Sequence, residues 1–244
     1  MPPSRRRVLV TGGGSGIGLA IARAFRATGC ETFIAARNKR PLQEAGLPYV
    51  MMDIRDADSI RAGLAQCGVI DIFIASAGGA ATAPALKTTP EQWDEMIALN
   101  LTSVFHCAQA AIAPMVERGW GRFIAIGSTA SLKGYRYASA YAAAKHGVLG
   151  LVRSLALELA QTGVTSNAIC PGYADTPMIA RAVEAISAKT GRTREEAERA
   201  LNDCNPMGRL VRPDEVAAAA LYLASEAAAA VNGQAIAVDG GETA

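Results

Sequence analysis

Tyr141 and Lys145 carry the pair of side chains best suited to proton chemistry in this sequence, a phenol and an ammonium four residues apart. Because an α-helix turns once in 3.6 residues, this spacing places both groups on one helix face. A cation about 4 Å away, at an effective dielectric constant of about 20, stabilises a phenolate by about 4 kcal/mol. A phenol with a pKa near 10 needs about that much to ionise at neutral pH. The pair predicts a tyrosine that acts as general acid or base, although the same spacing is common on helix surfaces without function.

Two further polar residues, Asn100 and Ser128, precede this pair along the chain. Ser128 follows an apolar run that ends at Ile126, which predicts a position at the carboxyl end of a strand. A hydroxyl there can hydrogen-bond a substrate oxygen and hold it within reach of the phenol. Asn100 lies in an otherwise apolar helical stretch, where a buried amide more often satisfies a backbone group than takes part in a reaction.

A glycine-rich turn, Thr11–Gly18, follows the first predicted strand and opens a helix. Glycines let the backbone approach a pyrophosphate closely, and the free amides of a helix N-terminus favour an anion. The spacing is Gly-x-x-x-Gly-x-Gly rather than the strict Gly-x-Gly-x-x-Gly, and an unliganded turn is the alternative. Five glycines in seven residues favour a nucleotide site. The expected contacts are Gly12, Gly14, Ser15, Gly16, Ile17 and Gly18.

The end of the second predicted strand bears on which nicotinamide cofactor binds. In the usual dinucleotide fold an acidic residue at this point binds the adenosine ribose. Here the strand continues into Arg37-Asn-Lys-Arg40, which has three cations and no carboxylate. A solvated basic turn is the alternative, but the missing acid favours NADP(H), with Arg37 on the 2′-phosphate; NAD(H) stays possible. Asp53 and Ile54, after the third strand, are expected beside the adenine.

Together and in this order, the motifs resemble the classical short-chain dehydrogenase/reductase family across essentially the whole chain. The segments that carry the resemblance are Thr11–Gly18, Asp53, Ala75–Gly78, Asn100, Ser128, Tyr141 with Lys145, Pro171–Gly172 with Thr176, and Val238–Gly241. This set is specific for the family and poorly specific for substrate. Two departures are visible. Family members commonly read Asn-Asn-Ala-Gly at Ala75–Gly78, where an asparagine braces the sheet, and many NADP-preferring relatives have a basic residue at Ser15.

The resemblance implies a sheet of seven parallel strands, a nicotinamide cofactor and a catalytic tetrad of Asn100, Ser128, Tyr141 and Lys145. It implies that Asn100 holds a water that passes protons from Lys145 to solvent. Thr176 would hold the nicotinamide carboxamide, and the segment after it would close over substrate. The remaining cofactor contacts that the resemblance implies are Ala77, Gly78, Tyr141, Lys145, Pro171 and Gly172.

The elements that must hold these residues alternate between short apolar runs and longer helical patterns. The predicted strands are 7–11, 32–36, 49–52, 70–75, 122–126, 165–169 and 235–238. The predicted helices are 17–28, 57–66, 90–118, 139–162 and 213–225. Most strand runs are continuously apolar, as expected where helices cover both faces of a parallel sheet. We therefore predict an α/β fold, with residues 1–244 forming a single Rossmann-type, doubly wound domain.

Two stretches interrupt the alternation. Residues 37–48 form a short stretch that contains two prolines and leaves little room for a crossover helix. Residues 175–212 are more numerous, and a capping box at Thr193–Glu196 predicts a helix there. We expect two short helices, split at Gly191. Because ligands of open α/β sheets bind along the carboxyl edge, we interpret residues 175–212 as a substrate lid; an insertion without function is the alternative.

Composition narrows the class of function. The chain has 244 residues, of which half are apolar and 19% charged, and this excludes a disordered protein. The net charge of +2 argues against nucleic-acid binding. The apolar runs fall short of the ~20 residues of a membrane span, so no membrane partner is expected. Five widely spaced cysteines predict reduced thiols in a cytoplasmic protein, with neither a disulfide framework nor a metal site.

The expected partner is a small-molecule carbonyl or alcohol substrate. Candidate pocket residues are apolar or aromatic: Leu132, Tyr135, Tyr137, Tyr173, Met178 and Met207. The sequence resembles 3-oxoacyl-thioester reductases about as well as polyol and cyclic-alcohol dehydrogenases, and we rank the 3-oxoacyl type first. A non-catalytic NADP-sensing regulator on this fold is another alternative, although the intact Ser128, Tyr141 and Lys145 argue against it. An epimerase or dehydratase of the extended relatives would need a larger C-terminal substrate domain.

Many members of the family are tetramers, so the resemblance also implies a homotetramer. In that assembly the helices at 90–118 and 139–162 would form one interface. The C-terminal strand would form another.

Overall fold

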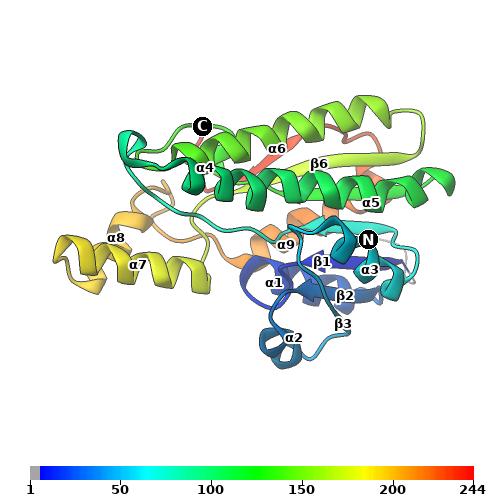
Figure 1. The fold of residues 1–244 in the computed structure, drawn as a ribbon, viewed down its shortest axis with the longest axis horizontal. Helices are drawn as coiled ribbons and strands as arrows, with labels where there is room; N and C mark the ends of the chain where they lie inside the picture. The colour runs from blue at the N-terminus through cyan, green and yellow to red at the C-terminus, as the bar shows by residue number, and fades with distance from the viewer. Residues whose placement is uncertain (1–5) are drawn as a thin grey trace.

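A computed structural model describes residues 6–244, and a seven-stranded sheet forms its centre (Figure 1). The strand order is β3-β2-β1-β4-β5-β6-β7, and all neighbouring pairs are parallel. The strands are β1 (Arg7–Thr11), β2 (Glu31–Ala36), β3 (Tyr49–Met51), β4 (Ile72–Ala75), β5 (Gly121–Ile126), β6 (Val164–Pro171) and β7 (Ala235–Val238). The predicted Rossmann-type parallel sheet is confirmed, with strand ends shifted by at most two residues.

The sheet changes its winding direction between β1 and β4. From β1 the chain builds outward through β2 and β3, then returns to β4 on the other side and continues to β7. Thr11 and Ala75, the last residues of β1 and β4, are paired in register. Ligands of doubly wound sheets bind at this reversal, beyond the carboxyl ends of the strands. The glycine-rich turn and the segment Ala75–Gly78 therefore lie side by side at this reversal.

Helices cover both faces of the sheet, as the continuously apolar strands predict. Those on one face are α3 (Ala57–Cys67), α5 (Ser103–Glu117) and α6 (Ser139–Glu158). Those on the other are α1 (Gly16–Ala27), α2 (Lys39–Ala45) and α9 (Pro213–Leu223). Each face has its own core cluster, because neighbouring strand residues such as Leu9 and Val10 point to opposite sides. Short 3₁₀ turns lie at Ala85–Lys87, Thr129–Ser131 and Glu226–Ala228.

The stretch predicted as one helix over 90–118 is interrupted. It consists of α4 (Pro90–Ile97), a π-helical turn at Ala98–Thr102, and α5. The turn contains Asn100, whose side-chain amide donates to the Met96 carbonyl at 3.1 Å. Single π turns inside helices occur frequently at functional sites. Hydrophobic periodicity does not reveal one widened turn, so the sequence predicted a continuous helix.

The same stretch, Pro90–Glu117, is long and apolar enough to cross a membrane by length and composition. Its inward residues, among them Val104, Ala108 and Met115, are buried in the core cluster between α5 and the sheet. Packing in the core accounts for the apolar side chains on the inward face of this helix.

The prediction that residues 37–48 leave little room for a helix is wrong. They form α2, which follows Asn38 and ends at Gly46, where φ is +69°. Pro41 lies in the first turn of this helix, where a missing backbone N–H removes no intrahelical hydrogen bond. Leu42 is fully buried and anchors the helix to the sheet.

Residues 175–212 form the two predicted short helices, α7 (Pro177–Thr190) and α8 (Arg194–Asn202). Gly191, at φ +71°, ends α7, and the Thr193–Glu196 capping box begins α8. Their contact is a small apolar cluster around Val183, Ala197 and Leu201, separate from the two clusters on the sheet. In Figure 1 the two helices (yellow) project from the body of the molecule.

Candidate active site

The glycine-rich turn packs directly against the end of β4. Gly12 has φ +68°, and a β-carbon there would lie 2.9 Å from the Cα atom of Ala77. The Thr11 hydroxyl accepts hydrogen bonds from the backbone amides of Ser76 (3.1 Å) and Ala77 (3.2 Å). Thr11 therefore braces the strand ends, and the departure at Ser76 does not leave them unlinked.

The N-terminus of α1 is open to an anion. Ser15, the N-cap residue of α1, is exposed, and its side chain makes no capping hydrogen bond with any described residue. The first turn of α1 contains no acidic residue. Gly16 has φ +53°, and a β-carbon there would lie 3.1 Å from the Thr176 methyl carbon. The turn thus joins free helix amides to Thr176, and these residues fit a nicotinamide dinucleotide with its pyrophosphate on α1.

The residues expected to bind the adenosine part of the cofactor come together less completely. Arg37 is exposed at the end of β2, and its charge acts on Asp53. Asp53 pairs with Arg55, whose Nη2 lies 2.9 Å from Oδ2, and this hydrogen bonding lowers the pKa of Asp53. Arg40 is bonded to Glu44 at 2.8 Å, so only part of the predicted basic cluster remains available to a phosphate. Ile54 is buried in the core.

Lys145 lies fully buried beneath the carboxyl edge of the sheet. Its Nζ donates to the Ile126 carbonyl at 2.8 Å and lies 5.8 Å from the centre of the Tyr141 ring. Burial lowers the pKa of Lys145 to about 8. A β-carbon on Gly78 would lie 2.8 Å from Asn100 Oδ1 and 3.8 Å from Lys145 Nζ. The structure thus brings Asn100, Lys145 and Tyr141 together around the end of β4.

The phenol of Tyr141 stays protonated in the protein alone. Burial raises its pKa, and a hydrogen bond with the Ser128 side chain acts in the opposite direction. The sequence predicts that Lys145 does most of the work of lowering this pKa and that a positive nicotinamide ring adds to it. In the protein alone, desolvation is the largest effect and raises the pKa. The physical reason is desolvation, because burial disfavours the charged form of a phenol.

Ser128 is fixed by the 3₁₀ turn that follows it. Its backbone is extended, with φ −168°, and its hydroxyl accepts from the Ala130 amide at 3.1 Å. The Ser131 hydroxyl in turn accepts from the Ser128 amide at 3.2 Å. This reciprocal capping fixes the position of Ser128 just beyond the end of β5.

Both polar ends of Asn100 are occupied within the protein. Its amide nitrogen donates to Met96, and its oxygen accepts from the Gly79 amide at 3.1 Å. The ordinary role of satisfying the backbone is therefore present. The water-holding role implied by the family resemblance stays a prediction.

Pro171, Gly172 and Thr176 lie where β6 leaves the sheet. The Gly172 amide donates to the Val238 carbonyl at 3.1 Å, which ties the end of β6 to β7. Thr176 caps α7: its hydroxyl accepts from the Ile179 amide (3.4 Å) and donates to the Ala174 carbonyl (3.1 Å). The cofactor residues expected here share one edge with the tetrad.

Comparison with known proteins decides the family. The chain matches the profile described as enoyl-(acyl carrier protein) reductase over residues 12–243. It is 41% identical to D-beta-hydroxybutyrate dehydrogenase of Cupriavidus necator, over 97% of each chain. The chain belongs to the short-chain dehydrogenase/reductase family. This short-chain dehydrogenase/reductase is also 39% identical to granaticin polyketide synthase putative ketoacyl reductase 1 of Streptomyces violaceoruber, over 96% of this chain and 91% of that one.

Among solved structures, a variant of actinorhodin polyketide ketoreductase with NADPH aligns with a TM-score of 0.92. It is 37% identical and covers 98% of this chain and 97% of that chain. This short-chain dehydrogenase/reductase is accordingly a nicotinamide-dependent oxidoreductase that interconverts carbonyl and alcohol groups of small molecules.

Sequence reasoning missed one residue at this edge, Glu242. Its side chain is 1% exposed and hydrogen-bonds to Tyr135, one of the expected pocket residues. Tyr135 packs edge-on against Tyr173, with ring centres 6.4 Å apart, and burial raises the pKa of Tyr173 to about 12. A separation of more than 100 residues between Tyr135 and Glu242 leaves no local pattern that could have predicted the contact.

Proposed function

We propose that this short-chain dehydrogenase/reductase is a 3-oxoacyl-type carbonyl reductase that uses NADPH, with Tyr141 as its general acid. One observation carries the assignment of the acid: Tyr141 is a half-buried phenol whose ring centre lies 5.8 Å from Lys145 Nζ, and burial raises its pKa, so it keeps its proton. A protonated group within reach of a substrate oxygen is what reduction of a carbonyl requires. The bound nicotinamide supplies the hydride.

The protein residues then divide the proton chemistry among them. Ser128 donates a hydrogen bond to the carbonyl oxygen and orients it, and Tyr141 donates the proton to that oxygen as the alcohol forms. For alcohol oxidation the roles reverse, and Tyr141 acts as the base.

Lys145 and Asn100 support this step. Among the described residues, the Lys145 ammonium has one hydrogen-bond acceptor, the Ile126 carbonyl, so its other N–H groups are available to a cofactor ribose hydroxyl and to a water. Asn100 lies beside it at Gly78 and would hold that water. Through it, Lys145 and Tyr141 would regain a proton from solvent after each turnover.

NADP(H) is the cofactor we assign, with NAD(H) as the alternative. Arg37 follows β2, where an acidic residue would otherwise bind the ribose hydroxyls, and no ion pair within residues 6–244 engages its guanidinium. A guanidinium at this point suits the 2′-phosphate, because it forms strong charge-assisted hydrogen bonds.

The substrate class rests on the relatives and on the pocket residues. One relative is named as a hydroxybutyrate dehydrogenase and another as a putative ketoacyl reductase. Both names indicate a substrate whose reacting oxygen lies near an acyl group. The expected wall combines Tyr135 and Tyr173 with the exposed side chains of Met178 and Met207. These apolar surfaces suit an acyl chain more than a polyhydroxylated one.

We further propose that the protein is a homotetramer. Phe105 on α5 and Leu157 on α6 are large apolar side chains that stand exposed, Leu157 at 81%. The helices that carry them are those expected at an interface. Light scattering should give about four times the 25.3 kDa of the chain.

The proposed function is tested with a panel of substrates and nicotinamide absorbance as readout. The panel contains 3-oxoacyl thioesters, simple ketones, polyols and cyclic alcohols, each with the phosphorylated and the non-phosphorylated cofactor. We expect NADPH oxidation that is fastest with a 3-oxoacyl thioester. Silence across the panel, with cofactor binding demonstrated, would instead favour a cofactor-sensing regulator.

A further inference from the structure

Glu242 lies in the segment after β7 and reaches into the wall of the expected substrate pocket. Lys133 donates to its backbone carbonyl at 3.0 Å and pairs with its carboxylate at 3.3 Å. The Tyr135 hydroxyl is bonded to the same carboxylate oxygen, Oε1. A nearly unexposed carboxylate is expensive to bury, and here it is compensated by one cation and one phenol.

The contact continues to the residue beside Ser128. The Tyr135 hydroxyl lies 2.6 Å from the Thr129 hydroxyl as well as against Glu242. A phenol has one proton and an ionised carboxylate has none, so the Tyr135 proton is directed to Glu242 and the Thr129 hydroxyl completes the other bond. A partly buried hydrogen-bonded chain thus runs from Glu242 through Tyr135 to Thr129, the neighbour of the substrate-orienting serine.

The position of Glu242 is itself fixed from two sides. Asp239 accepts hydrogen bonds from the Gly241 amide, the Thr243 amide and the Thr243 hydroxyl, at 3.0, 3.0 and 2.5 Å. On the other side, Glu242 Oε2 lies 2.9 Å from where a β-carbon on Gly172 would stand. That oxygen is buried and has no hydrogen-bond partner among the residues described. Leaving such an atom unpaired is costly, so stability alone does not explain this arrangement.

We propose that Glu242 is a positioning residue of the active site, which sets the place of Ser128 and of the pocket wall through Tyr135 and Thr129. This inference rests on the proposed reductase function. Its removal should displace the group that orients the substrate oxygen while leaving Tyr141 and Lys145 in place. The effect should therefore fall on the KM for the carbonyl substrate more than on kcat or on cofactor binding.

The test compares Glu242→Gln, Glu242→Ala and Tyr135→Phe, each assayed with the best ketone of the panel. Glu242→Ala and Tyr135→Phe should raise the KM for the ketone about tenfold, since small misplacements of orienting groups weaken productive binding strongly. Glu242→Gln keeps an oxygen that can accept from Tyr135, and should recover part of the loss. The Kd of NADPH and the value of kcat should change less than about threefold.

A double variant and a distant carboxylate separate positioning from general stabilisation. Tyr135→Phe combined with Glu242→Ala should raise the KM no more than the worse single change, because both interrupt one chain of contacts. Glu226→Gln alters a carboxylate at the opposite edge of the sheet, and its KM should equal that of the wild type.

The outcomes distinguish the two proposals. An unchanged KM in Tyr135→Phe and Glu242→Gln, or additive losses in the double variant, would overturn the positioning role while the reductase function stands. If Glu242→Ala fails to fold, the other two variants still decide the matter. A wild-type protein that is silent across the panel would remove the reductase function and this inference with it.

Discussion

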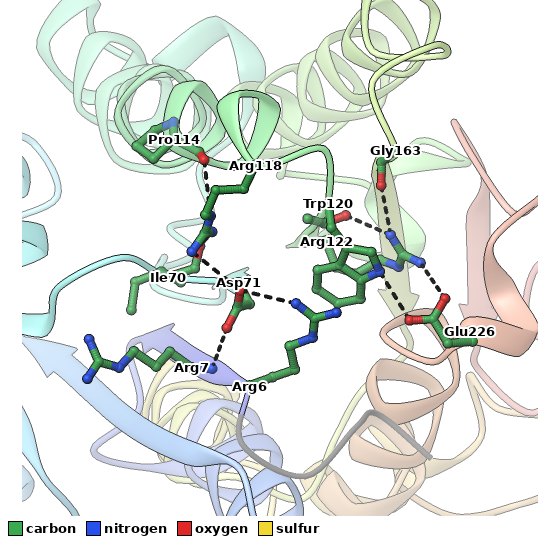
Figure 2. Close-up of polar contacts among 11 residues, drawn as sticks. Arg6, Arg7, Ile70, Asp71, Pro114, Arg118, Trp120, Arg122, Gly163 and Glu226 are labelled. Carbon is green, nitrogen blue, oxygen red and sulfur yellow. Dashed lines mark hydrogen bonds and ion pairs between the residues drawn. The ribbon is translucent and has the colours of Figure 1, made fainter.

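The two edges of the sheet differ in how many partners surround their charged side chains. At the amino edge, Asp71 lies among three arginines: it accepts from the Arg7 amide at 2.8 Å and lies 3.5 Å from both Arg6 and Arg118. Figure 2 shows the Trp120 ring beside these residues, with the Arg6 and Arg122 guanidiniums over it at 3.8 and 4.3 Å. This edge pairs its cations with a carboxylate and an aromatic ring.

Arg122 shows how many partners the amino edge provides for a buried charge. Its side chain is 2% exposed, and burial lowers its pKa. Its Nη1 nonetheless donates to the Gly121 and Gly163 carbonyls, at 2.8 and 3.2 Å, and Nη2 faces Glu226 at 3.9 Å (Figure 2). The amino edge therefore surrounds this buried charge with several partners, although the Arg122 Nε atom has none among the described residues and the burial of this side chain carries a cost.

Lys145 at the carboxyl edge has no comparable set of partners. Its ammonium bonds to one backbone carbonyl, and none of the described carboxylates lies within ion-pair distance of it. A buried cation in this state destabilises the fold, as its lowered pKa reflects. Perturbed pKa values cluster at functional sites, so the difference between the edges supports the proposal that the reaction takes place at the carboxyl edge.

Lys145→Met should lower activity and raise stability, and this should be the largest divergence between the two properties. Turnover should fall by about 10³-fold or more, because general acid–base assistance of this kind contributes 10²–10⁴-fold. At pH 7 the variant should be more stable than the wild type by about 3 kcal/mol, which corresponds to the fall in the Lys145 pKa from 10.5 to about 8. Steady-state kinetics and urea unfolding measure the two effects.

The pH dependence of that stability difference has a definite sign. Between pH 8 and 10.5 the unfolded wild type binds a proton at Lys145 that the folded protein lacks, so wild-type stability rises with pH. The advantage of Lys145→Met should be complete below about pH 8 and vanish near pH 10.5. A variant less stable than the wild type at every pH would contradict this account of the carboxyl edge.

Arg37→Asp should weaken NADPH binding by about a hundredfold, because a charge-assisted contact becomes a repulsion. NADH binding should change less or improve. Arg40→Asp is the matched control, since Arg40 is already bonded to Glu44 and should matter little. Fluorescence titration gives both dissociation constants. A wild type that prefers NADH, with a ratio unaltered by Arg37→Asp, would overturn the NADP(H) assignment.

Asp71→Ala should show the opposite balance from Lys145→Met. It removes the acceptor shared by Arg6, Arg7 and Arg118, so the free energy of unfolding should fall by about 2 kcal/mol. The values of kcat and KM should stay within about twofold of the wild type at a temperature where the variant is folded. A large loss of turnover in this folded variant would mean that the amino edge also takes part in the reaction.

Residues 175–212 should respond to ligands as an active-site lid does. This response should be smaller than the effects of the substitutions above. Their helices share a small apolar cluster apart from the main cores, so they can move with little loss of packing. Trypsin should cut between Lys189 and Arg199 in the free protein, and cofactor with substrate should slow this cleavage several-fold. Cleavage after Arg118, at the amino edge, is the control. Equal cleavage of the lid with and without ligands would favour an insertion without function.

The sequence predicted most of the scaffold because its signals are local. Continuous apolar runs indicated buried parallel strands, and the Gly191 and Thr193 signals indicated the break between α7 and α8. The π turn at Asn100 was missed because one widened turn leaves helical periodicity almost unchanged. Helix α2 was missed because its proline falls in the first turn, where it does not break a helix.

The chemistry of the site could be predicted only as a set of residue types. The sequence named Tyr141 and Lys145, but not the desolvation that raises one pKa and lowers the other. Glu242 was not predicted at all, because only the folded chain brings it to Tyr135. Burial and long-range contacts depend on the packed structure, and residue spacing does not contain them.

The most direct test of the account is the turnover of Tyr141→Phe, which removes a single phenolic oxygen. Turnover should fall by about 10³-fold or more, while the Kd of NADPH and the free energy of unfolding stay near their wild-type values. That result would place the proton donor at the carboxyl edge. A folded Tyr141→Phe protein with near-normal turnover would contradict the mechanism and the assignment of this edge as the active site.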